Sequence, residues 1–318
     1  MYRIPTPEAV EHILKAVTKS ARWELSILGQ GASSFAWLAK GTTDTLVVRA
    51  MPPHHSKPIT YGVELSILQA LNPRGLLVPA PIATSEPPNA VELEDVGFPW
   101  AVTRSVWGTP IGKHSLTVQA AEQLGKLLRA LHDLPCTGYG WLRINEQGWY
   151  GEQSSALAGA RERWAENALW PLDSSTLESH IVAQLAPDLL PALRDAQQRL
   201  IEAASEGIGA ICHTDLHRGH LYMRGEFLTG LIDFGDVAIL PPAWEFAILA
   251  VFYGWSSVRE ILRAYSEDAA QRQTILDQAQ VLAVIVGLYK LNRALQWNMG
   301  QASLDDGIAF LREAVAAL

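Results

Sequence analysis

Cysteine and long apolar runs are both scarce in this sequence. The 318 residues include 2 cysteines, Cys136 and Cys212, and their spacing matches no disulfide framework or metal motif. We therefore expect two buried thiols. No stretch reaches the ~18 consecutive apolar residues of a membrane-spanning helix, and even the apolar run at 281–288 is followed by Lys290 and Arg293. That run is interpreted as a buried helix, so neither a disulfide scaffold nor a membrane span is expected.

An excess of basic residues is also missing. The chain has 25 Lys and Arg residues against 33 Asp and Glu residues, a formal net charge of -8 at pH 7, which gives no electrostatic footprint for nucleic acid. An acidic surface would instead favour a cationic substrate. No hydrophobic signal segment opens the sequence, so we expect a soluble cytoplasmic protein with no nucleic-acid or membrane partner.

The first third has a mixed pattern. The apolar content of 48% is enough for one large domain or for two lobes that each bury a core. Thr6 and Pro7 predict the start of a helix, and strand-like runs with short turns between them follow. The runs predicted as strands are 23–28, 35–40, 45–51, 91–93 and 100–106, and a second helix is predicted at 61–71. This order predicts an antiparallel sheet and no parallel βαβ unit.

The remainder of the chain is predicted to be mostly helical. A strongly periodic helix at 124–131 is terminated by Pro135, and a second helix covers about 187–204. A strand, a loop and two short strands joined by a turn at Arg224-Gly225 follow. Everything after residue 235 is expected to be helical.

Two aspartates each follow a short apolar strand. Asp215 lies in Ile211-Cys-His-Thr-Asp-Leu-His-Arg-Gly-His220, and Asp233 lies eighteen residues later in Leu231-Ile-Asp-Phe-Gly235. Phosphoryl transfer from a nucleoside triphosphate needs one carboxylate to orient the acceptor hydroxyl and another to hold metal on the phosphates. The pattern favours a small-molecule kinase.

The same residues carry a resemblance to a known family. His213-x-Asp215-x-x-x-x-His220 and Ile232-Asp-Phe-Gly235 resemble the catalytic and metal loops of the aminoglycoside phosphotransferase family, which is related to choline kinases and distantly to protein kinases. The resemblance implies a two-lobed, protein-kinase-like α+β fold. Residues 1–106 would form the nucleotide-binding lobe, and residues 107–318 a helical lobe with the catalytic loop, the metal loop and the substrate pocket.

The resemblance also implies roles for single residues. Asp215 would orient the acceptor hydroxyl, and Asp233 would bind Mg²⁺ on the phosphates of ATP or GTP. His220 stands where the family usually has Asn and is similar to the macrolide branch, so it is predicted at the metal, as a direct ligand, a phosphate contact or a contact through water. His213 and His217 are expected to stabilise the loop.

A glycine-rich segment between the first two predicted strands is the second site feature. Gly29, Gly31, Ser33 and Ser34 could bring backbone N–H groups close to phosphates. No Gly-Lys-Ser/Thr follows, so the segment is not a Walker loop. A hairpin loop with two glycines would by itself indicate only a turn. Because this segment precedes the later motifs in the expected order, it is predicted to bind nucleotide.

Four further residues are predicted at the nucleotide. Arg49 ends an apolar strand where kinase-like folds have the basic residue that contacts the phosphates, although Lys is commoner there. Glu64 on the following helix is its expected ion-pair partner. Arg104 and Val106, at the end of the last predicted strand of this lobe, complete the set.

The acceptor site is less clear from the sequence. Aromatic walls suit a sugar ring or a macrolide face, although tryptophans also serve only to pack helices. Asp236 is interpreted as a turn cap, and Glu245 stands where the family often has Asp to brace the catalytic loop. The tryptophans and carboxylates considered for this site are Trp141, Trp149, Trp164, Trp170, Glu146, Glu152, Glu162, Glu166, Asp305 and Asp306.

Three functions therefore stay open. The first is transfer of the γ-phosphoryl group of ATP or GTP to a hydroxyl of an aminoglycoside or macrolide. The second is a metabolic small-alcohol kinase of the choline, homoserine or thiosugar type. The third is a pseudokinase that works as a binding module, which His220 and Arg49 would support and the intact pair Asp215 and Asp233 would not.

Overall fold

The chain forms two units that interleave in sequence. The computed structural model describes residues 5–18, 22–30, 34–51, 59–93, 95–112, 115–164 and 169–318. The first unit consists of Met1–Pro110, Arg143–Asn145 and His220–Gly235, and the second of Ile111–Leu142, Glu146–Gly219 and Asp236–Leu318. The sequence prediction divided the chain after residue 106 and assigned 220–235 to the helical lobe, so the segment that carries Asp233 is grouped differently here.

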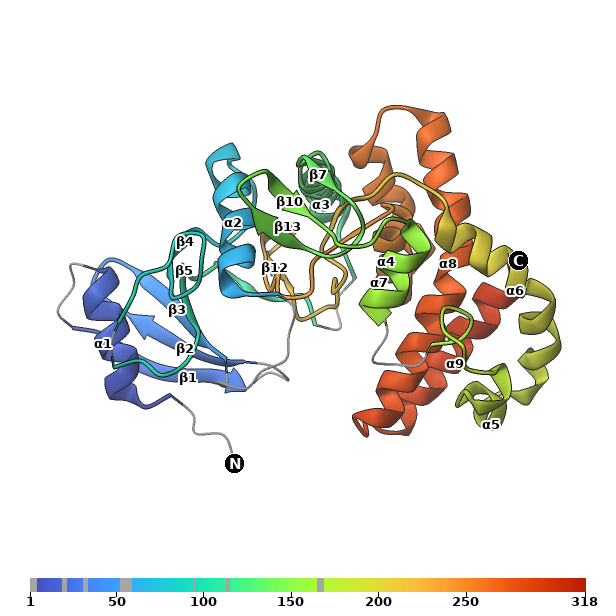
Figure 1. The fold of residues 1–318 in the computed structure, drawn as a ribbon, viewed down its shortest axis with the longest axis horizontal. Helices are drawn as coiled ribbons and strands as arrows, with labels where there is room; N and C mark the ends of the chain where they lie inside the picture. The colour runs from blue at the N-terminus through green and yellow to red at the C-terminus, as the bar shows by residue number, and fades with distance from the viewer. Residues whose placement is uncertain are drawn as a thin grey trace. The chain divides into compact units, whose positions relative to one another are not determined.

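An N-terminal helix covers one face of a sheet in the first unit. α1 (Pro7–Val17) begins at Thr6, whose side chain accepts a hydrogen bond from the backbone N–H of Ala9, as the Thr-Pro pair predicts. Its buried residues Val10, Ile13 and Leu14 pack against Trp37, Val48 and Trp100 of the sheet, and Figure 1 shows the helix beside the strands. This contact is the core of the unit.

The sheet itself is an antiparallel five-stranded sheet in the order β1-β2-β3-β5-β4. Its strands are β1 (Glu24–Gln30), β2 (Phe35–Lys40), β3 (Thr45–Ala50), β4 (Pro81–Thr84) and β5 (Trp100–Arg104). The segment predicted as a strand at 91–93 is not one of the five strands: a single bridge joins Ala90 to Thr84 of β4, and Val91 and Leu93 pack against the core. The actual strand, β4, begins at a proline, and prolines on either side of it hid the alternation that marks a strand.

One helix and a second small sheet complete the first unit. α2 (Tyr61–Leu71) is capped by Thr60, whose side chain accepts from the N–H of Val63. It is followed by a 3-10 turn at Asn72–Arg74. β6 (Thr109–Pro110), β12 (Leu221–Arg224) and β13 (Phe227–Leu231) form a three-stranded sheet in the order β13-β12-β6. Because β12 pairs with β6, the segment that carries Asp233 belongs to the first unit.

The second unit is mainly helical. Its longer helices are α3 (Val118–His132), α4 (Ala156–Trp164), α6 (Leu190–Ser205), α7 (Ala243–Tyr265), α8 (Ala269–Gln296) and α9 (Gln301–Ala316), and its shorter ones are α5 (Val182–Leu185) and the 3-10 turns Leu177–Ser179 and Pro187–Leu189. α8 packs against α6, α7 and α9, and Figure 1 shows α8 beside α9. By length and composition α8 could cross a membrane, but 61% of its most apolar window is buried in the protein, as the sequence predicts for a core helix.

Short strands flank the segment 213–219, which carries Asp215, in the second unit. β11 (Ala210–Cys212), β14 (Ala238–Leu240) and β8 (Gly140–Trp141) form a sheet in the order β11-β14-β8. Two further strands, β7 (Cys136–Thr137) and β10 (Gly148–Tyr150), pair in parallel, and the chain also forms β9 (Arg143–Asn145). The expectation of an all-helical chain after residue 235 was wrong, because β14 is a three-residue buried strand that is too short to show a period of two.

The fold class predicted from the sequence is confirmed. The first unit is an antiparallel sheet with two helices, and the helices from α3 onward belong to the second. α7 changes direction at Gly254, which has a φ of 76° inside the helix, a conformation that favours glycine. This break lies directly after Phe252 and Tyr253.

Candidate active site

Arg49 is the centre of the polar cluster in the first unit. Its Nη1 lies 2.5 Å from Oε1 of Glu64 on α2, and its Nη2 lies 2.9 Å from Oδ1 of Asp233. Burial alone lowers the pKa of Arg49, but the carboxylates of Glu64 and Asp233 raise that pKa above its ordinary value. The guanidinium is therefore a permanent cation that holds two carboxylates at once through its planar fork.

Tyr61 and Ser34 lie beside this cluster. The guanidinium of Arg49 is 5.3 Å from the centre of the Tyr61 ring, a cation–π distance. Burial raises the pKa of the Tyr61 phenol, and the Ser34 hydroxyl, at the end of the glycine-rich segment, is close enough to lower it. Ser34 therefore lies beside the Tyr61 phenol, and its contact with nucleotide stays a prediction.

Asp233 has an unusual backbone conformation. It lies in the left-handed region with a φ of 64°, which is uncommon for a residue other than glycine. Its side chain contacts Arg49 through one oxygen, and its Oδ2 lies 3.4 Å from Nε2 of His220, while the carbonyl of His220 accepts a hydrogen bond from the N–H of Ile232. Such strain persists where the surroundings fix the residue, and it is often found at functional sites.

The predicted metal residues fit a divalent cation to different degrees. The Asp233 side chain is 35% exposed, and a partly exposed carboxylate oxygen is the kind of ligand that Mg²⁺ takes while keeping several waters. The His220 side chain is 11% exposed, and its imidazole nitrogen is a softer ligand. The Asp233 carboxylate therefore suits the metal, and the place of His220 against Asp233 suits a residue that fixes its orientation.

The glycine-rich segment is described only in part. Gly29 lies in β1, where the pairing with β2 shifts register between Ile27 and Gly29. Gly31 and Ser33 lie outside the described residues, so their predicted role in nucleotide binding stays a prediction.

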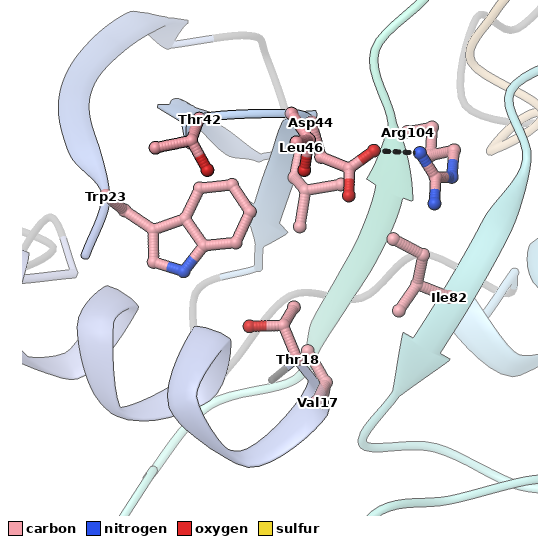
Figure 2. A pocket seen from close by; sticks show the side chains of 10 residues that line it. Val17, Thr18, Trp23, Thr42, Asp44, Leu46, Ile82 and Arg104 are labelled. Carbon is pink, nitrogen blue, oxygen red and sulfur yellow. Dashed lines mark hydrogen bonds and ion pairs between the residues drawn. The ribbon is translucent and has the colours of Figure 1, made fainter. Parts of the chain in front are cut away.

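Arg104 and Val106 lie in different surroundings. Arg104 is opposite Leu46 on β3, whereas Arg49 is opposite Ala101, so the two arginines are three positions, about 10 Å, apart along the sheet. Arg104 forms an exposed ion pair with Asp44. The pair borders a cavity of about 360 Å³ that Trp23 also lines, as Figure 2 shows.

Val106 lies closer to the metal segment than Arg104. A Cβ placed on Gly230 would come within 2.6 Å of Val106 Cγ1, so the valine is in contact with β13, three residues before Asp233. The structure brings Arg49, Glu64, Ser34, His220 and Asp233 together with Val106 at their edge, and it does not bring Arg104 to them.

In the second unit, Glu245 holds the backbone that leads to Asp215. Glu245 on α7 is fully buried, and its two oxygens accept hydrogen bonds from the N–H of His213 at 2.5 Å and of Thr214 at 3.0 Å. Thr214 is in the left-handed region with a φ of 60°. A carboxylate that accepts two backbone N–H bonds in a buried site fixes those residues firmly, which is the bracing role expected for Glu245.

Arg163 holds the same turn from α4. Its Nε donates to Oγ1 of Thr214 at 2.8 Å, and its guanidinium lies 4.0 Å from Oδ2 of Asp236. The Thr214 hydroxyl in turn donates to the backbone carbonyl of Asp236. No signal in the sequence marks Arg163, because an arginine on a helix usually has a solvated side chain; its burial follows from the fold alone.

The two histidines beside Asp215 make contacts within the loop. His213 is fully buried, and its Nδ1 accepts from the N–H of Asp215 at 3.3 Å. Nδ1 of His217 accepts from the N–H of Gly219 at 2.9 Å, and its Nε2 lies 3.9 Å from Oδ2 of Asp215. These contacts fit the predicted loop-stabilising role, and the Asp215 side chain remains 33% exposed and accessible to a substrate.

The tryptophans of the acceptor region divide into two groups. Trp164 and Trp170 are 2% and 3% exposed, and Trp164 packs against Trp244 and Tyr289, so both are core residues. Trp141 and Trp149 are half-buried, and Trp141 lies under the Arg163 guanidinium at 4.7 Å.

The carboxylates considered for the acceptor also differ. Glu162 accepts a hydrogen bond from the N–H of Trp141, and Asp305 accepts one from Gln301 on its own helix. Glu166 lies outside the described residues. Glu146 and Glu152 are exposed, like most surface carboxylates.

Comparison with known proteins is consistent with this arrangement. The family model described as "Phosphotransferase enzyme family" matches residues 24–280, while a search of curated proteins gives no match. An aminoglycoside phosphotransferase APH(4)-Ia mutant in ternary complex with AMP-PNP and hygromycin B is 14% identical, with a TM-score of 0.64 over 97% of this chain and 98% of that one.

Two further solved structures have the same fold. The GDP complex of aminoglycoside 2'-phosphotransferase-IIIa is 18% identical, with a TM-score of 0.57 over 97% of this chain and 98% of that one. Spectinomycin phosphotransferase APH(9)-Ia, in complex with ADP and spectinomycin, is 15% identical, with a TM-score of 0.58 over 98% and 96%. Since the family model covers most of the sequence, the chain belongs to the phosphotransferase enzyme family and is a phosphotransferase.

Proposed function

We propose that the protein transfers the γ-phosphoryl group of ATP or GTP, with Mg²⁺, to a hydroxyl group of a small molecule. The observation that carries this proposal is the contact of Arg49 with both Glu64 and Asp233. It presents a fixed cation and a metal-binding carboxylate in one unit, the two groups that neutralise a triphosphate. The family's solved structures with AMP-PNP, GDP and ADP support a nucleotide as the donor.

In this proposal the residues of the first unit hold the donor. Arg49 contacts the phosphates or keeps Asp233 in place, and Asp233 binds the metal, which neutralises the charge of the triphosphate when it is bound. His220 keeps the second oxygen of Asp233 in a fixed orientation. Backbone N–H groups of the segment from Gly29 to Ser34 contact the phosphates, with Gly31 and Ser33 included as predictions. Val106 contacts the nucleotide base.

The residues of the second unit prepare the acceptor. Asp215 accepts a hydrogen bond from the acceptor hydroxyl and takes its proton as the oxygen attacks phosphorus, while the bond from phosphorus to the bridging oxygen of the nucleotide breaks and the diphosphate leaves. Glu245 and Arg163 fix the turn before Asp215. Little free energy is therefore needed to position Asp215 when the reaction occurs. Phosphoryl transfer depends mainly on such positioning, and a strong base is not needed.

The acceptor was predicted from the sequence to be an aminoglycoside or a macrolide. Hygromycin B and spectinomycin in the solved structures support testing these compounds first. Metabolic alcohols such as choline, homoserine and thiosugars are the alternative. A pseudokinase is disfavoured, because Arg49 holds the Asp233 side chain and Glu245 holds the two residues directly before Asp215. We further propose a cytoplasmic location, since α8, the long apolar helix found in the described part of the chain, is mostly buried.

A screen with purified protein tests the function. The enzyme is incubated with Mg²⁺, γ-labelled ATP or GTP and each acceptor class, and labelled product is measured, with Asp215→Asn as the matched control. We expect nucleotide-dependent labelling of at least one hydroxy compound by the natural protein and not by Asp215→Asn. Labelling that is the same with both proteins would show that the reaction does not use this site.

A further inference from the structure

Three cations in the second unit are stacked on aromatic rings. Lys290 Nζ lies 5.4 Å from the centre of the Phe252 ring, and the Arg218 guanidinium lies 5.1 Å from that of Tyr253. Arg293 lies 3.8 Å from the ring centre of Trp297 and 5.7 Å from that of Tyr289. Each ring provides an apolar surface next to a positive charge, which is a site for a molecule with both features.

Two of these cations, Lys290 and Arg293, are linked to Asp215 through aromatic side chains. The Phe252 ring that carries Lys290 also contacts the ring of His217 at 6.2 Å, and His217 in turn is 3.9 Å from Asp215. Tyr289 links Arg293 to Asp215. Burial raises the pKa of the Tyr289 phenol. The charges of Arg163 and Arg293 lower this pKa, and those of Asp215 and Asp236 raise it. Arg293 and Asp215 therefore act on the same phenol.

The carboxylates nearby in the described part of the chain do not form ion pairs with Lys290 or Arg293. Asp236 is paired with Arg163, and Asp215 is the residue proposed for the acceptor hydroxyl. The ammonium of Lys290 is partly buried: burial lowers its pKa, Asp306 raises it and the positive charge of Arg218 lowers it again. Among the described residues, neither Lys290 nor Arg293 is in an ion pair with a carboxylate. Two cations held near each other without such a pair are suited to an anion.

We infer that the acceptor is a hydroxy compound with an acidic group and an aromatic or apolar body. The acidic group, a carboxylate or a phosphate, would contact Lys290 and Arg293, and the body would lie against Phe252, Tyr253 and Trp297. Leu295, Trp297 and Met299, which are exposed large apolar side chains at the end of α8, extend this surface. A polycationic aminoglycoside would place its ammonium groups next to these cations, where like charges repel. The inference rests on the proposed function and narrows its acceptor class.

Matched acceptors test the inference. An aromatic alcohol such as 3-phenyllactic acid is compared with its amide, with the corresponding amine 1-amino-3-phenylpropan-2-ol, and with hygromycin B and kanamycin. Binding is measured by calorimetry in the presence of Mg²⁺ and AMP-PNP, and phosphorylation is measured with labelled ATP and GTP. We expect the acid to bind about tenfold more tightly than the amide, the contribution of one charge-assisted contact, and the amine and the aminoglycosides to bind more weakly still.

Charge-reversal variants test whether the preference for the acid comes from Lys290 and Arg293 or from the overall charge of the protein. Lys290→Glu and Arg293→Glu should each remove the preference for the acid and raise the affinity for the amine. Lys126→Glu, which reverses an exposed cation on α3, is the control and should leave the preference unchanged.

The outcomes distinguish this inference from the proposed function. If the acid binds no better than the amine, or if hygromycin B or kanamycin is the preferred acceptor, the inference is wrong and the kinase function stands. If the protein binds neither AMP-PNP nor GMP-PNP with Mg²⁺, the proposed function itself fails. A preference for the acid that survives both reversals would also overturn the assignment to Lys290 and Arg293.

Discussion

Arg49 of β3 and Asp233, 184 residues apart in the chain, form an ion pair in which Nη2 lies 2.9 Å from Oδ1. The pair links the central strand of the sheet to the residue proposed to bind metal. Since the other nitrogen of the same guanidinium contacts Glu64, the orientation of Asp233 is fixed by α2 as well as by β3.

Arg49→Lys should therefore weaken nucleotide binding, although the substitution keeps the positive charge. A single ammonium group cannot make the two parallel contacts of the guanidinium fork, so Asp233 loses its support and the KM for Mg²⁺-nucleotide should rise about tenfold, the equivalent of one charge-assisted hydrogen bond. Steady-state kinetics at varied nucleotide concentration measure this effect.

The matched control is Arg104→Lys, at the exposed ion pair with Asp44. It should leave the KM for nucleotide unchanged, because Arg104 lies away from the Arg49 cluster along the sheet. An equal rise in both variants would instead support the sequence prediction that Arg104 binds nucleotide.

His220 is expected to act through Asp233. His220→Ala removes the imidazole that lies 3.4 Å from Oδ2 of Asp233, and activity should fall about 10- to 100-fold, the usual effect of losing a neighbour of a metal ligand. His220→Asn, the commoner residue of the family, should keep part of the activity by offering an amide. The exposed His12→Ala is the control. Full activity of His220→Ala would show that this residue has no part in the mechanism.

Glu245 should matter for stability as well as for catalysis. In Glu245→Gln one of the two N–H donors, from His213 or Thr214, meets an amide NH₂ group instead of an oxygen, and the free energy of unfolding should fall by about 2 kcal/mol. Glu245→Asp keeps both acceptor oxygens and should lose less. Urea unfolding of the three proteins compares them. An unchanged midpoint for Glu245→Gln would mean that the short hydrogen bonds to Glu245 do not stabilise the loop.

His180 gives a pH-dependent contribution to stability. Burial lowers the pKa of its imidazole from 6.5 to about 4, against a smaller raising effect of Asp173, and its Nδ1 accepts a hydrogen bond from the N–H of Val182 at 3.1 Å. The unfolded chain therefore binds the proton more readily than the folded protein between pH 6.5 and 4. Stability is full above pH 6.5 and is lost as the pH falls through this window, by about 1 kcal/mol at pH 5.5.

Unfolding in urea at pH 7.5 and pH 5.5 measures this contribution. The difference in unfolding free energy between the two pH values should shrink in His180→Asn and stay the same in His12→Asn, an exposed position on α1. Equal pH dependence in all three proteins would contradict the assignment to His180.

The sequence predicted the parts of the site that depend on chain order. Asp215 and Asp233 were recognisable because each follows a short apolar strand within a motif, and Arg49 and Glu64 because they follow the glycine-rich segment in the expected order. Arg163 could not be predicted, since its burial depends on the packing of α4 against the turn at Thr214. The same limit hid β4 and β14, whose few residues are strands only because a neighbouring strand pairs with them.

The acceptor side shows a similar division. The aromatic content of the second part was visible in the sequence, but Trp164 and Trp170 are core residues. Lys290 and Arg293 appeared only as the charged end of an apolar run. The position of Lys290 over Phe252 depends on how α7 and α8 pack, which no local pattern reports, whereas Arg293 and Trp297 lie four residues apart at the end of α8.

Calorimetry of nucleotide binding tests the central claim, that Asp233 holds the metal on the donor while Asp215 serves the acceptor. The natural protein, Asp233→Asn and Asp215→Asn are each titrated with AMP-PNP or GMP-PNP, with and without Mg²⁺, and their turnover is measured in parallel. Asp233→Asn should lose the Mg²⁺-dependent part of binding, and Asp215→Asn should bind as the natural protein does while its turnover falls at least ~10²-fold. Absence of nucleotide binding by the natural protein, or Mg²⁺-dependent binding that persists in Asp233→Asn, would contradict the account.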